Sequence, residues 1–295
     1  MSDTLDDAPS VHAPPVAKIP MLRTARETYA FVFSNFGSVC GSTWVAAFVS
    51  AVLSDLLEPY ASTVDGGVYR VPVGLVITLF DLLLLSIMAV AIGQLVLGYR
   101  SRPSYIHFSM GVPVWRMFRA CLLLMVIFTA VLFLGVLVAV AVRLPIGLIL
   151  LALLAAGAFV FVRYLFYLPI AAILAPDARL QRSFALSKNN FWQILALSLA
   201  ILPPVFVLGL AKDGLQLAAA GDSGSFHWPT SLGDMAAMLR GLRSSTQGLL
   251  SWRTVASIGI DTIGSVIGWG LIVTAAALAY RSHYPLPDTS AEIFD

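Results

Sequence analysis

Two aspartates stand inside apolar stretches of this 295-residue sequence, where an ionised carboxylate is unfavourable unless it is protonated, paired or hydrated. Asp81 lies 18 residues before Tyr99, and Asp261 lies 19 residues before Tyr280, so the two carboxylates occupy nearly equivalent places in their stretches. A carboxylate at such a depth could serve a proton, a cation or a polar substrate. The alternative is a structural role, in which each carboxylate joins neighbouring helices by a hydrogen bond or an ion pair.

Two serines share a face with the second aspartate. Ser257, Asp261 and Ser265 follow one another at intervals of four residues, which places them on one side of a helix. Together with Asp81 they form the predicted intramembrane polar site.

Three cations are candidates for contact with lipid headgroups. Arg163 lies inside an apolar stretch, too far along it to pair with Asp81, and we expect its guanidinium to extend to the cytoplasmic face or to meet lipid phosphate. Arg182 and Lys188 lie in a short basic segment that is expected at the same interface.

The composition excludes several other kinds of site. Four histidines and two cysteines show neither the HExxH nor the CxxC spacing of metal sites, so we predict no metal, no cofactor and no enzymatic activity. A net charge of +2 gives no reason to expect nucleic acid as a partner. Hydrophobic residues make up 59% of the chain and charged residues 12%, a balance that one water-soluble core cannot accommodate.

The elements that carry these residues are six apolar stretches. Each is close to or above the roughly 20 residues that a helix needs to cross a bilayer. We therefore predict an all-α, polytopic membrane helix bundle with six transmembrane helices. A kink is expected in the fifth span at Pro203 and Pro204. The spans are predicted at 38–57, 71–98, 120–142, 144–174, 193–211 and 255–280.

An internal repeat divides the spans into three hairpins. Before the first, third and fifth spans, two aromatic residues stand seven positions apart, on one face of a short helix. Each unit is then an amphipathic interfacial helix followed by a transmembrane hairpin, and the hairpins should be related by an approximate threefold axis. The aromatic pairs are Tyr29 and Phe36, Phe108 and Trp115, and Phe184 and Phe191.

The ends and loops complete the predicted organisation. Residues 1–20 and 282–295 are expected to be disordered cytoplasmic tails that flank a membrane domain at 21–281. The outer loop 212–253 is expected to carry a surface amphipathic helix. Lysine and arginine are more numerous on the side of the termini, which by the positive-inside rule is the cytoplasm.

One segment carries a family resemblance. The residues from Leu180 to Trp192, LQRSFALSKNNFW, resemble a pattern in the six-span membrane domain that accompanies some bacterial glycerophosphodiester phosphodiesterases and that also occurs alone. Phe184 stands where the pattern usually has tryptophan, and Asn189 where it usually has glycine. No phosphodiesterase domain accompanies the pattern here. The resemblance implies residence in a bacterial inner membrane and does not imply lipid hydrolysis.

Two functional hypotheses follow from these features. The first is a non-enzymatic integral membrane protein that acts through membrane lipid headgroups or through an unidentified membrane or cytoplasmic protein. The second is a transporter, or an ion or proton pathway, that uses Asp81 and Asp261. Carboxylates packed among small residues without a cavity would favour the first hypothesis, and a water-accessible cleft that reaches them would favour the second.

Overall fold

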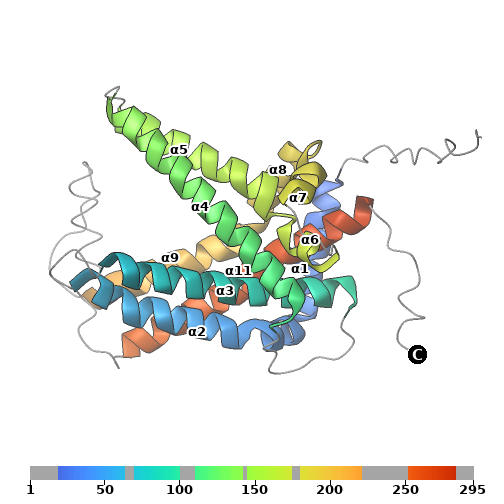
Figure 1. The fold of residues 1–295 in the computed structure, drawn as a ribbon. Coiled ribbons are helices and arrows are strands. Elements are labelled where there is room, and N and C mark those ends of the chain that lie inside the picture. Colours follow the sequence, from blue (N-terminus) through green and yellow to red (C-terminus); the bar gives the residue numbers. More distant parts are fainter. Residues whose placement is uncertain are drawn as a thin grey trace, which may run out of the picture.

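The computed structural model describes residues 19–63, 70–99, 110–141, 145–174, 180–220 and 252–283. This part of the chain is all-helical and contains no strand, which confirms the predicted fold class (Figure 1). The helices are α1 (Met21–Ser34), α2 (Phe36–Thr63), α3 (Arg70–Leu97), α4 (Val112–Ala141), α5 (Ile146–Val160), the π-helical turn η1 (Phe161–Leu165), α6 (Leu168–Leu174), α7 (Leu180–Ser187), α8 (Phe191–Ile201), α9 (Pro203–Ala220) and α11 (Trp252–His283).

The apolar stretches form the predicted spans. Five helical runs are long and apolar enough to cross a membrane: α2, α3, α4, the run from α5 to α6, and α11. A sixth span is completed by α8 and α9, which bend by 43° at Leu202. The bend confirms the kink predicted at Pro203 and Pro204, because neither proline can donate the backbone hydrogen bond that would continue α8 straight.

The second span ends at Gly98, where the backbone leaves helical geometry. Gly98 takes a φ of 79°, which a residue with a side chain rarely adopts. The amide of Tyr99 then donates to the carbonyl of Gln94 at 3.0 Å, and the Gly98 amide donates to that of Leu95 at 3.3 Å. These two bonds satisfy carbonyls that the helix end would otherwise leave open.

Helix α11 is the centre of the assembly. It contacts α1, α2, α3 and α9, and 56% of the residues in its apolar segment are buried inside the protein. Close approach is possible because a Cβ on Gly270 would lie 3.3 Å from a Val39 methyl and 3.5 Å from a Val32 methyl. The backbone of α11 therefore lies directly against α1 and α2.

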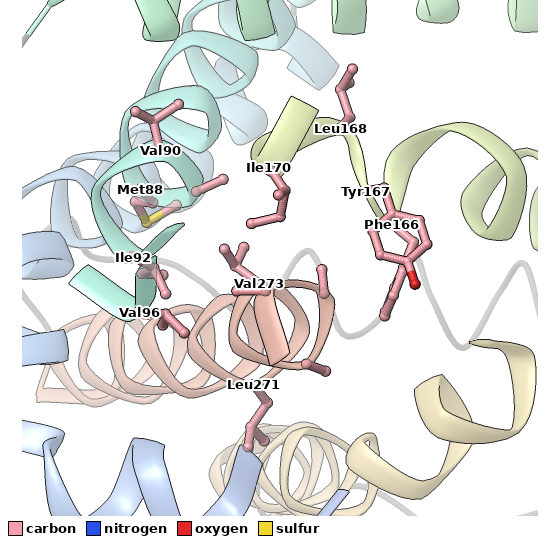
Figure 2. Packing of buried hydrophobic residues seen from close by; sticks show 14 of the residues in the cluster. Met88, Val90, Ile92, Val96, Phe166, Tyr167, Leu168, Ile170, Leu271 and Val273 are labelled. Carbon is pink, nitrogen blue, oxygen red and sulfur yellow. The ribbon is translucent and has the colours of Figure 1, made fainter. Parts of the chain in front are cut away.

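The tightest core lies where α3, α6 and α11 meet. In Figure 2, Ile170 of α6 points toward Val273 of α11, with Met88 and Ile92 of α3 beside them. A Cβ on Gly93 would lie 2.6 Å from the terminal carbon of Ile173, so α3 and α6 touch at this glycine.

The middle hairpin is packed differently from the other two. Helices α4 and α5 diverge from the rest of the molecule (Figure 1). Only 11% of the residues in the apolar segment of the third span, and 6% in that of the fourth, are buried. The buried residues of α4 lie in its first half, from Val114 to Leu124. The approximate threefold relation would give the three hairpins equivalent surroundings, and these values show that the middle one is an exception.

Two of the three predicted interfacial helices are separate elements. Helix α1 precedes α2, and α7 precedes α8, each as a short helix with serine or threonine on its buried side. For the third, Phe108 lies outside the described residues, whereas Trp115 belongs to the first turn of α4. The described part of that segment is therefore the start of the span itself.

The predicted tails and outer loop fall largely outside the described residues. Residues 1–18, 221–251 and 284–295, which include the predicted surface helix, are not described. Of the predicted outer loop, residues 212–220 are described and are helical, since α9 continues to Ala220, and α11 begins at Trp252.

Candidate functional site

Asp81 lies within the first hairpin and is bound by its own partner helix. The Ser50 hydroxyl of α2 donates to Asp81 Oδ1 on α3 at 2.9 Å, and both groups are partly buried. This bond joins the two helices of one hairpin, which fits the structural role considered for this residue.

Asp261 has a cationic partner that the sequence analysis did not identify. Lys212 of α9 donates to Asp261 Oδ2 of α11, with 25% and 28% of the two side chains exposed. Lys212 begins the predicted outer loop, because the apolar stretch ends at Ala211. A helical signal was nevertheless present, since Val205, Leu208, Gly209 and Lys212 follow the i, i+3, i+4, i+7 spacing of one helix face.

A cavity of about 340 Å³ lies between the bent fifth span and α11. Two observations explain the space. The 43° bend turns α9 away from the direction of α8, and Gly209 and Gly264 contribute no side chain. A Cβ at either glycine would meet no atom within 4 Å. The lining residues are Ile201, Leu202, Val205, Leu208, Gly209, Ile260, Asp261, Gly264, Ser265, Gly268, Trp269 and Ile272.

Among the described residues of this lining, Asp261 and Ser265 bring a carboxylate and a hydroxyl, and the indole of Trp269 is the other side chain with a polar atom. Asp261 and Ser265 stand one helical turn apart on α11, whereas Ser257, the third member of the predicted stripe, is buried and does not line the cavity. Within the described residues, neither Asp261 Oδ1 nor the Ser265 hydroxyl makes a hydrogen bond. The cavity is thus apolar except at one place, where a carboxylate oxygen and a hydroxyl are available.

The predicted polar site is therefore divided. Asp261 and Ser265 come together at the cavity, while Asp81 contacts Ser50 in another helix pair and is absent from the lining. The two carboxylates have different partners, one a hydroxyl and the other an ammonium group, despite their similar places in the repeat.

The three candidate headgroup cations also differ in their surroundings. Arg163 lies in η1, where its Nη1 donates to the Ser187 carbonyl at 3.0 Å. Its guanidinium carbon is 5.2–5.8 Å from the ring centroids of Phe159, Phe184 and Phe191. Arg182 and Lys188 are exposed beside it. Arg163 thus has protein partners of its own, and the exposed pair is free to meet solvent or headgroups.

Helix α7 attaches to the break in the fourth span through two serines. The Ser183 hydroxyl donates to the Tyr164 carbonyl at 2.6 Å, and the Ser187 hydroxyl donates to the Arg163 carbonyl at 3.1 Å. The α-helix is interrupted here because η1 takes π-helical geometry over Phe161–Leu165, and Pro169, which follows it, has no amide hydrogen to donate to the preceding turn. The serines of the segment that carries the family resemblance therefore satisfy carbonyls in a broken helix.

Helix α1 makes a corresponding hydrogen bond at the bend of the fifth span. Pro204 cannot donate to the carbonyl of Ala200, its partner in a regular helix. The Tyr29 hydroxyl donates to that carbonyl at 2.9 Å. Partial burial raises the pKa of Tyr29 above its ordinary value, because burial disfavours the phenolate.

The chemistry available at the cavity is recognition by hydrogen bonding and apolar contact. The described residues contain no cluster of three or more histidine, cysteine, aspartate or glutamate side chains that could hold a metal ion. Comparisons with protein-family models, with curated proteins and with solved structures found no match to this chain.

Proposed function

We propose that this protein is an integral membrane protein that binds an amphiphilic lipid in the cavity between α9 and α11 without transforming it. The observation that carries this function is the cavity itself, which is apolar along most of its wall and polar at one place. Its volume lies within the roughly 300–1,000 Å³ of small-molecule sites.

The position of the cavity supports a lipid as the occupant. Its walls belong to two spans of a chain whose helices are long and apolar enough to cross a membrane. In a membrane, lipid is the molecule that surrounds such spans. The lining of α11 extends from Ile260 to Ile272, about 18 Å along the helix axis. An extended hydrocarbon chain can lie along such a wall with its polar end beside Asp261.

The absence of catalysis is part of the same proposal. The Asp261 carboxylate at the cavity is paired with Lys212, and its other polar neighbour on the wall is a serine hydroxyl. A hydrolase would need a nucleophile held by a base, and a general base would need an unpaired group within reach of the substrate. Binding and release are the activities that this arrangement supports.

A photoreactive lipid tests the function directly. The purified protein in nanodiscs is exposed to a long-chain alcohol with a diazirine in its chain, and the labelled peptides are identified by mass spectrometry. We expect labelling concentrated on α9 and α11, reduced several-fold by Gly264→Leu, which fills the cavity.

Gly135→Leu is the matched control, because Gly135 is a helical glycine on the exposed side of α4 with no atom near its Cβ position. It should leave the labelling of α9 and α11 unchanged. Labelling spread evenly over all lipid-facing helices, or unaffected by Gly264→Leu, would rule out the cavity as the binding site.

A transporter or proton pathway is the second candidate function. It is favoured by the break in the fifth span beside an ion pair, since discontinuous helices form the substrate and ion sites of many transporters. Proteoliposomes with an internal pH dye and an imposed membrane potential separate the two candidates. Under our proposal, proton flux equals that of protein-free liposomes. A flux that Asp261→Asn abolishes and Asp81→Asn leaves unchanged would favour the pathway.

We also propose a location in a bacterial inner membrane with both termini in the cytoplasm, supported by the family resemblance and by the distribution of basic residues. Single cysteines introduced near Ser223 and near Ser187, in a chain from which Cys40 and Cys121 have been removed, test the orientation. An impermeant thiol reagent added to intact cells should modify the first site and spare the second. The opposite pattern would reverse the orientation.

A further inference from the structure

We propose that the occupant of the cavity is an uncharged amphiphile with a hydroxyl at its polar end, such as a long-chain alcohol or a monoacylglycerol. This inference rests on the proposed function and adds the chemical class of the ligand. It follows from which polar atoms reach the cavity and from the charge that they carry together.

Asp261 and Ser265 provide complementary hydrogen-bonding groups. Asp261 lines the cavity, and because its Oδ2 accepts from Lys212, Oδ1 is left as an acceptor. The Ser265 hydroxyl, one turn along α11, can both donate and accept. An alcohol matches this pair, because its hydrogen can go to Asp261 while its oxygen accepts from Ser265.

The charge at this end of the cavity disfavours ionic headgroups. The Lys212 ammonium group and the Asp261 carboxylate neutralise one another. An anionic headgroup would meet the carboxylate on the cavity wall, since Lys212 itself does not line the cavity. A cationic headgroup would compete with Lys212 for a carboxylate that is already paired. Either ion would also lose its hydration in an otherwise apolar space, which is unfavourable without a full counter-charge.

Lys212 therefore determines the charge selectivity of the cavity, although it does not line the cavity itself. Removal of either member of the pair leaves the other as an unbalanced charge beside the cavity. The preferred ligand should then carry the opposite charge. This reciprocal change of preference is specific to the pair, because a loss of packing alone would weaken all ligands together.

Three photoreactive probes with one diazirine-bearing chain and different ends test this inference: an alcohol, a sulfonate and a primary ammonium. In nanodiscs of uncharged lipid, the wild-type protein should be labelled in the cavity several-fold more by the alcohol than by either ion. Asp261→Asn should shift the preference to the sulfonate, and Lys212→Met should shift it to the ammonium. Ser265→Ala should weaken labelling by the alcohol several-fold without a preference for either ion.

The double variant Lys212→Met with Asp261→Asn removes both charges and should recover the preference for the alcohol. It also tests the inference if one single variant does not fold. Asp81→Asn is the control, because Asp81 lies outside the cavity, and it should leave the order of the probes unchanged.

The failure of this inference and that of the proposed function give different results. Equal labelling of the cavity by all three probes, or an order that neither charge variant alters, would overturn the ligand class and leave lipid binding intact. A cavity labelled by none of the probes would overturn both.

Discussion

At the scale of single residues, Arg163 shows how a cation is accommodated within an apolar span. Its guanidinium lies among the rings of Phe159, Phe184 and Phe191 and donates one hydrogen bond to the Ser187 carbonyl. The rings exclude water while their negative faces balance part of the positive charge. The arginine therefore joins the fourth span to α7 and to α8.

Replacement of Arg163 should destabilise the protein. We expect Arg163→Gln to lower the free energy of unfolding by about 1–3 kcal/mol, since a charged hydrogen bond and cation–π contacts are lost. Arg163→Lys should be intermediate, because it keeps the charge and loses the planar group that stacks on the rings. Thermal unfolding in detergent measures the effect, with the exposed Arg182→Gln as control. Equal effects of Arg163→Gln and Arg182→Gln would contradict this account.

Tyr29 is the residue whose contribution should depend on pH. Its hydroxyl must be protonated to donate to the Ala200 carbonyl. Because burial raises its pKa above the 10.0 of a free side chain, the folded state holds the proton more tightly than the unfolded state. The stabilisation is therefore complete below pH 10 and is lost as the pH rises through the raised pKa.

Tyr29→Phe should cost about 1 kcal/mol of stability at pH 8. The difference from the wild-type protein should become smaller as the pH rises from 8 through 10 and above, where the wild-type tyrosine loses its proton. Unfolding measured across this range checks the prediction, and Tyr99→Phe, at an exposed position, is the control. A difference that stays constant as the pH rises well above 10 would show that the hydroxyl proton is not responsible.

At the scale of elements, two spans depart from a regular α-helix, and a short helix binds carbonyls at each irregular place. The fourth span is interrupted by the π-helical turn η1 and the fifth is bent at Pro203 and Pro204, and hydroxyl groups from α7 and α1 bind carbonyls at these places. In a membrane an unsatisfied carbonyl costs several kcal/mol. Helices α7 and α1 thus satisfy carbonyls that these irregularities leave open, and the bend of the fifth span contributes to the cavity.

The link between Tyr29 and Pro204 can be measured by a double-mutant cycle. In Pro204→Ala, the new amide can donate to the Ala200 carbonyl, so that carbonyl no longer depends on Tyr29. Tyr29→Phe should then cost less in the Pro204→Ala background than in the wild-type protein, by about 0.5–1 kcal/mol. Additive effects of the two substitutions on unfolding would show that the hydroxyl does not replace the missing amide.

The sequence was most informative about the elements and least about their contacts. The spans could be predicted because a bilayer imposes a length and an apolar composition, and the bend because prolines lack an amide hydrogen. The pairing of Lys212 with Asp261 could not be predicted, since the apolar run ends at Ala211, where its composition changes, whereas α9 continues for nine more residues. The cavity depends on glycines that elsewhere, as at Gly270, allow close packing instead.

At the scale of the whole molecule, the packing is concentrated around α11 and at the end where α3 and α6 meet it. The middle hairpin shares this core only through the first half of α4. Substitutions should therefore have effects that depend on place rather than on residue type. The same substitution at a glycine in the core and at a glycine on the middle hairpin tests this.

Gly93→Val should lower stability by about 1–3 kcal/mol, because its first added carbon would lie 2.6 Å from the terminal carbon of Ile173, and that side chain must move within a closely packed core. Gly135→Val adds the same atoms on the exposed side of α4 and should be tolerated, or should stabilise the helix slightly. Thermal unfolding in the same detergent compares them. Equal destabilisation by both variants would show that the hairpin is packed as tightly as the core.

The central place of α11 has a consequence for biosynthesis. Helix α1 is made first, yet its contacts with α11 and α8 join it to segments that leave the ribosome much later. The first hairpin must therefore remain without one of its main packing partners while the rest of the chain is translated. Only the arrival of α11 converts a set of inserted hairpins into one cooperative unit, so a chain interrupted before Trp252 would present its unpaired helices to the quality-control proteases of the membrane.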